Sequence, residues 1–222
     1  DDVLEINWLQ NIFKKTDSLY IADGHHRCEA AKLLSEENDD PNNKAKDFIL
    51  SYLISENNIK IYEFNRLIKD LNGLSKADFL KKLEAHFTII NHEEHPFKPT
   101  EKHQFGMYLD QQFYSLVLKK EQAHFENAHD ALDAQILYDK VLLPILNIVD
   151  LRNDERIEYI SGKQPIQDLK QKIDDQEFEV AFLLFPSNIN EIKALADHDL
   201  IMPPKSTYIE PKFRSGLVIY EL

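Results

Sequence analysis

The sequence predicts an α/β or α+β protein with a mixed β-sheet and flanking helices. Apolar runs rich in branched and aromatic residues, such as FILSYLIS (48–55) and FEVAFLLF (178–185), alternate with stretches of helical apolar spacing. A hairpin-like segment, QFGMYLDQQFYSLVLK (104–119), interrupts this alternation. Interruption by hairpins favours a mixed sheet over a purely parallel one.

The first third of the chain has the pattern helix, strand, turn, helix. Apolar residues at helical spacing predict a helix over 3–15, and SLYIAD (18–23) has strand character. Asp23-Gly24 is a turn signal, and AAKLL (30–34) carries the apolar pattern of a second helix. The charged stretch SEENDDPNNKAKD (35–47) then predicts a solvated loop before the strand at 48–55.

The rest of the chain continues the alternation. Ser75 with Asp78 resembles a capping box that begins a helix over 75–87. The hairpin at 104–119 turns near Asp110 and Gln111, and Pro144 ends or kinks the helix LDAQILYDKVLLPIL (132–146). The other predicted elements are strands at 59–64, 87–90, 178–185 and 216–222, and helices near 165–174 and 188–196.

Composition excludes several classes of protein. The chain has 222 residues and a net charge of −13, so a broad nucleic-acid-binding surface is not expected. No window approaches the roughly 20 apolar residues of a membrane-crossing helix. One cysteine, Cys28, allows no internal disulfide, and we expect a cytoplasmic protein. The chain begins without methionine, directly in an amphipathic pattern, which is typical of a fragment of a longer protein.

The sequence DGHHR (23–27) predicts an anion site at the junction of a strand and a helix. The first amides of a helix lack partners within the helix and carry partial positive charge, and Gly24 lets the backbone approach a phosphate closely. Arg27 could bind phosphate oxygens, and His25 and His26 could donate hydrogen bonds or move protons. Asp23 could hold Mg²⁺ or accept a proton from a substrate hydroxyl. The alternative is a tight turn in which a histidine only caps the helix.

Two further segments offer polar groups to a ligand. In MPPKSTYIEPKFRSG (202–216), Lys205, Ser206, Thr207 and Arg214 could form a second anion clamp that faces the DGHHR turn, or a rigid loop with solvated charges. In FNRLIKDLNG (64–73), Arg66 could reach a phosphate, or could pair with Asp70 if both lie on a helix.

YIADGHHRCEAAKLL (20–34) resembles the signature of the DUF1015 family, bacterial and archaeal proteins of undefined function. The likeness continues through EFNRLIKDLNGLSKADFLKKLEAHF (63–87) and IMPPKSTYIEPKFRSGLVIYEL (201–222). Family members are typically longer at the N-terminus, so this chain resembles their C-terminal portion. Cys28 stands where a tyrosine is usual.

DGHHR also resembles the helix start of the ParB/sulfiredoxin superfamily, whose corresponding turn grips nucleotide phosphates and which includes free-serine kinases. We expect one compact α/β unit over 1–222. Its alternative is two subdomains, one at 1–73 that this resemblance makes ParB/sulfiredoxin-like and a mixed α+β one at 74–222.

The resulting expectation is a nucleotide- or phosphate-binding protein of phosphotransferase type. It would use ADP or ATP with Mg²⁺, act on a small hydroxylated substrate, and employ Asp23, His25 and His26 in catalysis. The alternatives are a nucleotide- or anion-binding regulatory module without turnover, which would use the same residues, and a purely structural or interaction protein. A shared fold does not decide between them.

Overall fold

The chain folds into two compact units. The computed structural model describes residues 2–37, 43–212, 214 and 216–221. Unit 1 comprises Asp1–Ser55 and Lys212–Leu222, and unit 2 comprises Glu56–Pro211. The chain therefore leaves unit 1 after Ser55 and returns to it at Lys212. The predicted boundary after residue 73 lies inside unit 2, beyond its first strand.

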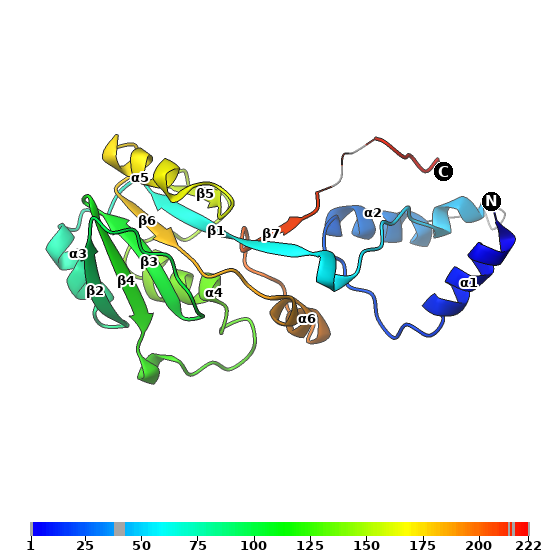
Figure 1. Ribbon diagram of the computed structural model, residues 1–222, viewed down its shortest axis with the longest axis horizontal. Helices are drawn as coiled ribbons and strands as arrows, with labels where there is room; N and C mark the ends of the chain where they lie inside the picture. The colour runs from blue at the N-terminus through cyan, green and yellow to red at the C-terminus, as the bar shows by residue number, and fades with distance from the viewer. Residues whose placement is uncertain (1, 38–42, 213, 215, 222) are drawn as a thin grey trace. The chain divides into compact units, whose positions relative to one another are not determined.

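Unit 2 is built on one β-sheet (Figure 1). The described strands form a seven-stranded sheet in the order β2-β4-β3-β6-β1-β5, with β7 paired to β1. Every pairing between these strands is antiparallel. The predicted sheet with flanking helices is thus confirmed, in its α+β form. The strands are β1 (Lys60–Ile68), β2 (Phe87–Glu93), β3 (Gln104–Leu109), β4 (Gln112–Leu118), β5 (Ile157–Ser161), β6 (Val180–Leu183) and β7 (Thr207–Glu210).

Two apolar cores cover the two faces of this sheet. Leu67 of β1 belongs to the core that contains Leu169 and Ile173 of α5 (Ile166–Asp174). Its neighbour Ile68 belongs to the larger core, with α3 (Lys76–Leu83) and α4 (Asp133–Leu137). Successive side chains of a strand point to opposite faces, so β1 separates the two cores.

Local signals in unit 2 are confirmed by the structure. Ser75 caps α3 by accepting a hydrogen bond from the Asp78 amide at 3.2 Å. The β3–β4 hairpin turns at Asp110 and Gln111, whose φ angles are 49° and 60°. Asn188 forms a complete capping box at the start of α6 (Ile189–Asp197). The helix predicted at 132–146 is α4 followed by a π-helical turn at Tyr138–Leu142, which ends before Pro144.

Unit 1 consists of helices and irregular segments. Its helices are α1 (Val3–Phe13), α2 (His25–Glu36) and the 3₁₀ turn η1 (Lys44–Asp47). The strands predicted at 18–23 and 48–55 are wrong, and residues 216–221 form no strand either. Side chains in these segments are largely exposed, with Phe48 at 63% and Tyr52 at 65%. A strand requires a neighbouring strand for its backbone hydrogen bonds, and the described part of unit 1 supplies none.

The helices are short throughout. The longest in the described ranges, α2, has 12 residues. No helix in the described ranges has the length and apolar character that crossing a membrane requires. Residues 38–42 of the loop predicted at 35–47 lie outside the described residues.

Candidate functional site

The DGHHR segment forms a turn that leads directly into α2. Gly24 is the N-cap residue, and its φ of 84° is left-handed, a conformation that glycine adopts without steric cost. The Gly24 carbonyl accepts hydrogen bonds from the amides of Arg27 at 2.9 Å and Cys28 at 3.0 Å. No side chain caps the helix, and its first turn contains no acidic residue. The N-terminal end of α2 therefore keeps its partial positive charge.

The Arg27 side chain folds back over Gly24. A Cβ atom at position 24 would lie 2.8 Å from Nη2 of Arg27, closer than real Cβ contacts. In this position Arg27 also forms an ion pair with Asp23, with 3.7 Å between Nη2 and Oδ2. The left-handed backbone conformation thus favours glycine at position 24, and the Arg27 guanidinium uses the space that a Cβ would take.

A second cation reaches the turn from the C-terminal segment of unit 1. Lys212 Nζ donates to Asp23 Oδ1 at 3.0 Å. This hydrogen bond is the main reason that the pKa of Asp23 is lowered, although partial burial opposes the shift. The structure therefore places two cations beside one carboxylate at the start of a helix. The sequence analysis did not select Lys212 as a site residue.

The two histidines occupy the first two positions of α2. His25 and His26 are both exposed, as is Arg27. Cys28 follows them as a half-buried free thiol. The catalytic roles expected for Asp23, His25 and His26 stay predictions.

Arg66 lies in unit 2 and is buried in the interior. Only 1% of it is exposed, because residues 64–68 belong to β1 and not to a helix. Its guanidinium donates to the Phe64 carbonyl and, at 3.4 Å, to the Lys205 carbonyl, and it lies 5.6 Å from the centre of the Tyr159 ring. Burial lowers the pKa of Arg66 to about 10. The helical pairing of Arg66 with Asp70 is therefore wrong.

The other predicted clamp residues lie at the end of unit 2 and in unit 1. Lys205 is exposed with a φ of 52°, and its Nζ lies 5.8 Å from the centre of the Phe64 ring. Ser206 is buried and donates to the Pro203 carbonyl at 2.7 Å, and Thr207 is the first residue of β7. Arg214, in unit 1, is exposed. The clamp of Lys205 onto the DGHHR turn stays a prediction, since these residues belong to different units.

The sequence analysis did not identify two buried carboxylates, those of Glu63 and Asp133. Glu63 is 3% exposed and Asp133 is 6% exposed. The Asp133 carboxylate accepts a hydrogen bond from the His103 amide at 2.9 Å, and burial raises the pKa of Asp133 to about 7. The burial of Glu63 could have been inferred from strand alternation. Glu63 and the core residue Leu67 are four residues apart on β1, so their side chains point to the same face of the sheet.

The fold and this turn define an α+β protein with an uncapped, cation-flanked helix start of the kind that suits an anion. The model of the family described as "Protein of unknown function (DUF1015)" matches residues 1–135. The match covers more than half of the chain, and the chain belongs to this family. A search of curated proteins gave no match.

Several solved structures are similar to this chain at low identity. A free serine kinase variant in complex with AMP has 16% identity and a TM-score of 0.47, over 88% of this chain and 69% of that one. A variant of the same kinase in complex with ADP has 17% identity and a TM-score of 0.45, with the same coverage. A conserved hypothetical protein from Pyrococcus furiosus has 16% identity and a TM-score of 0.46, over 90% of this chain and 73% of that one. Similarity at this level assigns no activity to this chain.

Proposed function

We propose that this chain binds the phosphate groups of a nucleotide at the Asp23–Arg27 turn and transfers a phosphoryl group to a small hydroxylated acceptor. The observation that carries the proposal is the uncapped start of α2 with two cations beside it. Unbonded helix amides and adjacent cations are complementary to a phosphate in both hydrogen bonding and charge.

Each group at the turn has a distinct role in this proposal. The first amides of α2 donate to phosphate oxygens, which approach Gly24 as the Arg27 guanidinium moves from it onto the phosphate. The planar Arg27 guanidinium binds two oxygens in a fork, and Lys212 contributes a mobile point charge. Both cations now contact Asp23, so phosphate binding would replace or share these ion pairs.

Mg²⁺ would bind at this turn only together with the nucleotide. No group of three or more His, Cys, Asp or Glu side chains among the described residues could hold a metal ion. Mg²⁺ is commonly bound by one or two carboxylates together with phosphate oxygens, so Asp23 would supply a single protein ligand. Bound in this way, Mg²⁺ would neutralise charge on the phosphates. His25 or His26 would then accept the proton of the acceptor hydroxyl.

One observation favours a second candidate function, nucleotide or anion binding without turnover. The Asp23 carboxylate takes part in two ion pairs, and its pKa is lowered. A carboxylate held in this way is a weak proton acceptor. A regulatory module would use the same turn and would need no base.

A thermal-shift panel tests the binding step. ADP, ATP, pyrophosphate and phosphate are added with and without Mg²⁺ to the wild type and to Arg27→Ala and Lys212→Ala. We expect a rise in melting temperature that is selective for nucleotides and is lost in both variants. Lys32→Ala is the matched control, because Lys32 is an exposed cation on the same helix and pairs with Glu36. A shift that survives in Arg27→Ala and Lys212→Ala would overturn the proposed site.

Turnover separates the two candidates. Phosphoryl transfer to small hydroxylated acceptors is measured for the wild type, Asp23→Asn and His26→Ala. Product formation that both variants lose while they still bind nucleotide supports the phosphotransferase. Nucleotide binding with no product from any acceptor supports the regulatory module.

A further inference from the structure

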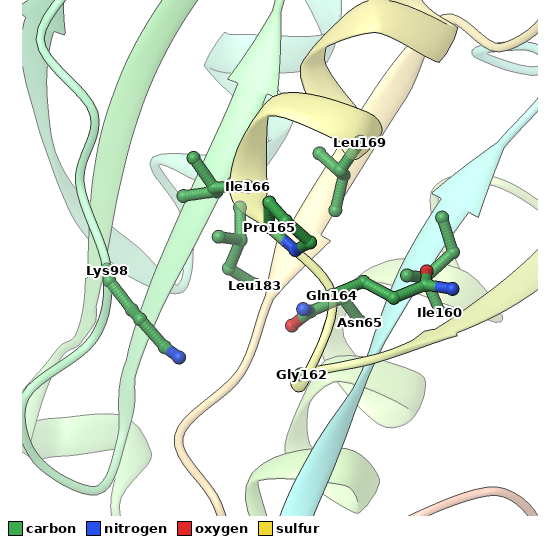
Figure 2. A pocket seen from close by; sticks show the side chains of 9 residues that line it. All are labelled: Asn65, Lys98, Ile160, Gly162, Gln164, Pro165, Ile166, Leu169 and Leu183. Carbon is green, nitrogen blue, oxygen red and sulfur yellow. The ribbon is translucent and has the colours of Figure 1, made fainter.

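A cavity of about 230 Å³ lies in unit 2, where the start of α5 approaches the sheet (Figure 2). Its polar lining comes from Asn65 of β1, Gln164 of the β5–α5 loop and Lys98 of the β2–β3 connection. Its apolar lining includes Ile160, Leu169 and Leu183. The cavity has the size and mixed lining of a site for a molecule of several non-hydrogen atoms.

The Glu63 carboxylate contacts two residues that line this cavity, Gly162 and Lys98. Glu63 and Asn65 alternate along β1 and therefore point to the same face of the sheet. The Glu63 carboxyl group lies against Gly162, another lining residue, so closely that a Cβ atom there would overlap it. Its Oε1 contacts Lys98 Nζ at 3.3 Å. The carboxylate is thus bracketed by the lining residues Gly162 and Lys98.

One oxygen of the buried Glu63 carboxylate lacks a hydrogen bond. Only 4% of its side chain is exposed, and Oε1 has no hydrogen-bond partner in the described structure. The same oxygen forms an ion pair with Lys98, whose side chain is 58% exposed. A buried carboxylate oxygen without a hydrogen bond is costly, so a well-placed donor would recover part of that cost.

The surrounding groups decide what kind of donor fits. The Glu63 carboxylate lies against the lining residues Gly162 and Lys98, apolar side chains form part of the wall, and the lysine in the lining is 58% exposed. An ammonium group on an alkyl chain matches all three features, since it donates to a carboxylate and buries its methylene groups.

We propose that this cavity binds a small molecule that carries an alkylammonium group. The ammonium group donates to Glu63 Oε1 in place of Lys98, and the alkyl part packs against Ile160, Leu169 and Leu183. All of these residues belong to unit 2, so the site is independent of the phosphate turn proposed in unit 1.

NMR titration of the full chain tests this site with three probes of equal length: n-butylammonium, n-butanol and butyrate. We expect saturable shifts of the Gly162 and Gln164 amides with n-butylammonium only. Glu63→Gln should weaken this binding at least about tenfold, because a charge-assisted hydrogen bond is lost. Lys98→Met should tighten it about threefold, because an exposed competing cation is removed. Asp168→Asn, on the exposed side of α5, is the matched control and should change nothing.

The opposite responses of the two variants make the outcome decisive. Butyrate binding that Lys98→Met weakens would identify an anion site and overturn the proposal. If n-butanol bound as well as n-butylammonium, the site would be an apolar cavity without a role for Glu63, and the proposal would be overturned. The absence of a saturable shift with n-butylammonium would also overturn the proposal. Lys98→Met changes an exposed side chain, so the test stands even if Glu63→Gln fails to fold.

Discussion

The carboxyl group of Glu63 occupies the space that a side chain at position 162 would need. A Cβ atom built on Gly162 would overlap both the carboxyl carbon and Oε1 of Glu63. Gly162 follows β5 directly, and its amide donates to the Glu63 carbonyl at 2.8 Å. A strand pairing therefore fixes the two residues against each other through backbone and side chain together.

Gly162→Ala should lower the free energy of unfolding by about 1–3 kcal/mol, the usual cost of overpacking a close contact. Urea denaturation measures this change. The same substitution in a Glu63→Ala background should cost much less, because the overlapping group is gone. If Gly162→Ala lowered the free energy of unfolding equally in both backgrounds, the contact with Glu63 would not be the reason that position 162 needs glycine.

Asp133 should make stability depend on pH. The pKa of Asp133 is raised from its ordinary 3.8 to about 7 in the folded protein, chiefly by burial. Between these two values the folded state holds more protons than the unfolded state, so the free energy of unfolding falls as pH rises, and the loss is complete above about pH 7. Asp133→Asn should remove this pH dependence. Between pH 4 and pH 8 the wild type should lose on the order of a few kcal/mol of its free energy of unfolding, and Asp133→Asn should not lose it.

Denaturation at several pH values between 4 and 8 measures the Asp133 contribution. Asp139→Asn is the control, since Asp139 is exposed and lies in the helical turn that continues α4. If Asp133→Asn and Asp139→Asn changed the pH profile equally, the raised pKa of Asp133 would be refuted.

Arg66→Lys should destabilise unit 2 by about 1–3 kcal/mol, even though it keeps the charge. The guanidinium donates to two carbonyls, those of Phe64 and Lys205, and lies beside the Tyr159 ring. A lysine ammonium group cannot reproduce this planar arrangement, and buried carbonyls lose their donors. Urea denaturation measures the change, with Arg152→Lys at an exposed position as control. Equal stability of Arg66→Lys and the wild type would mean that these bonds contribute little.

Gly24→Ala should abolish the response of the DGHHR turn to ADP. The new Cβ would meet the Arg27 guanidinium, and a φ of 84° is unfavourable for alanine. Gly73→Ala is the matched control, because Gly73 has a similar φ of 74° but no atom within 4 Å of the built Cβ. A thermal-shift titration should show loss of binding in Gly24→Ala alone. If Gly24→Ala still bound the ligand, binding would not depend on the position of Arg27.

Local signals allowed much of unit 2 to be predicted. The turn at Asp110 and Gln111 and the cap at Ser75 depend on neighbours within a few residues, so the sequence contains the information directly. The strands predicted in unit 1 failed for the opposite reason. Residues 48–55 have the composition of a strand, but a strand forms only when a partner, distant in sequence, supplies the pairing.

In the candidate site, too, the local features could be predicted from the sequence and the contacts between distant residues could not. The Gly24 turn and the helix that follows it are local, and DGHHR predicted both. Lys212 lies 189 residues from Asp23, and no local pattern relates the two. The sequence offered Arg66 as a phosphate ligand or as a helical partner of Asp70, whereas residues 60–68 form β1, which carries Arg66 into the interior.

The path of the chain sets the order in which the phosphate turn can be completed during synthesis. Asp23, Gly24 and Arg27 are synthesised before unit 2, whereas Lys212 follows only after all of unit 2 has been made. A nascent chain that stops within unit 2 has the helix start and one cation but lacks the lysine. The turn therefore acquires its full positive charge only when translation has passed residue 212.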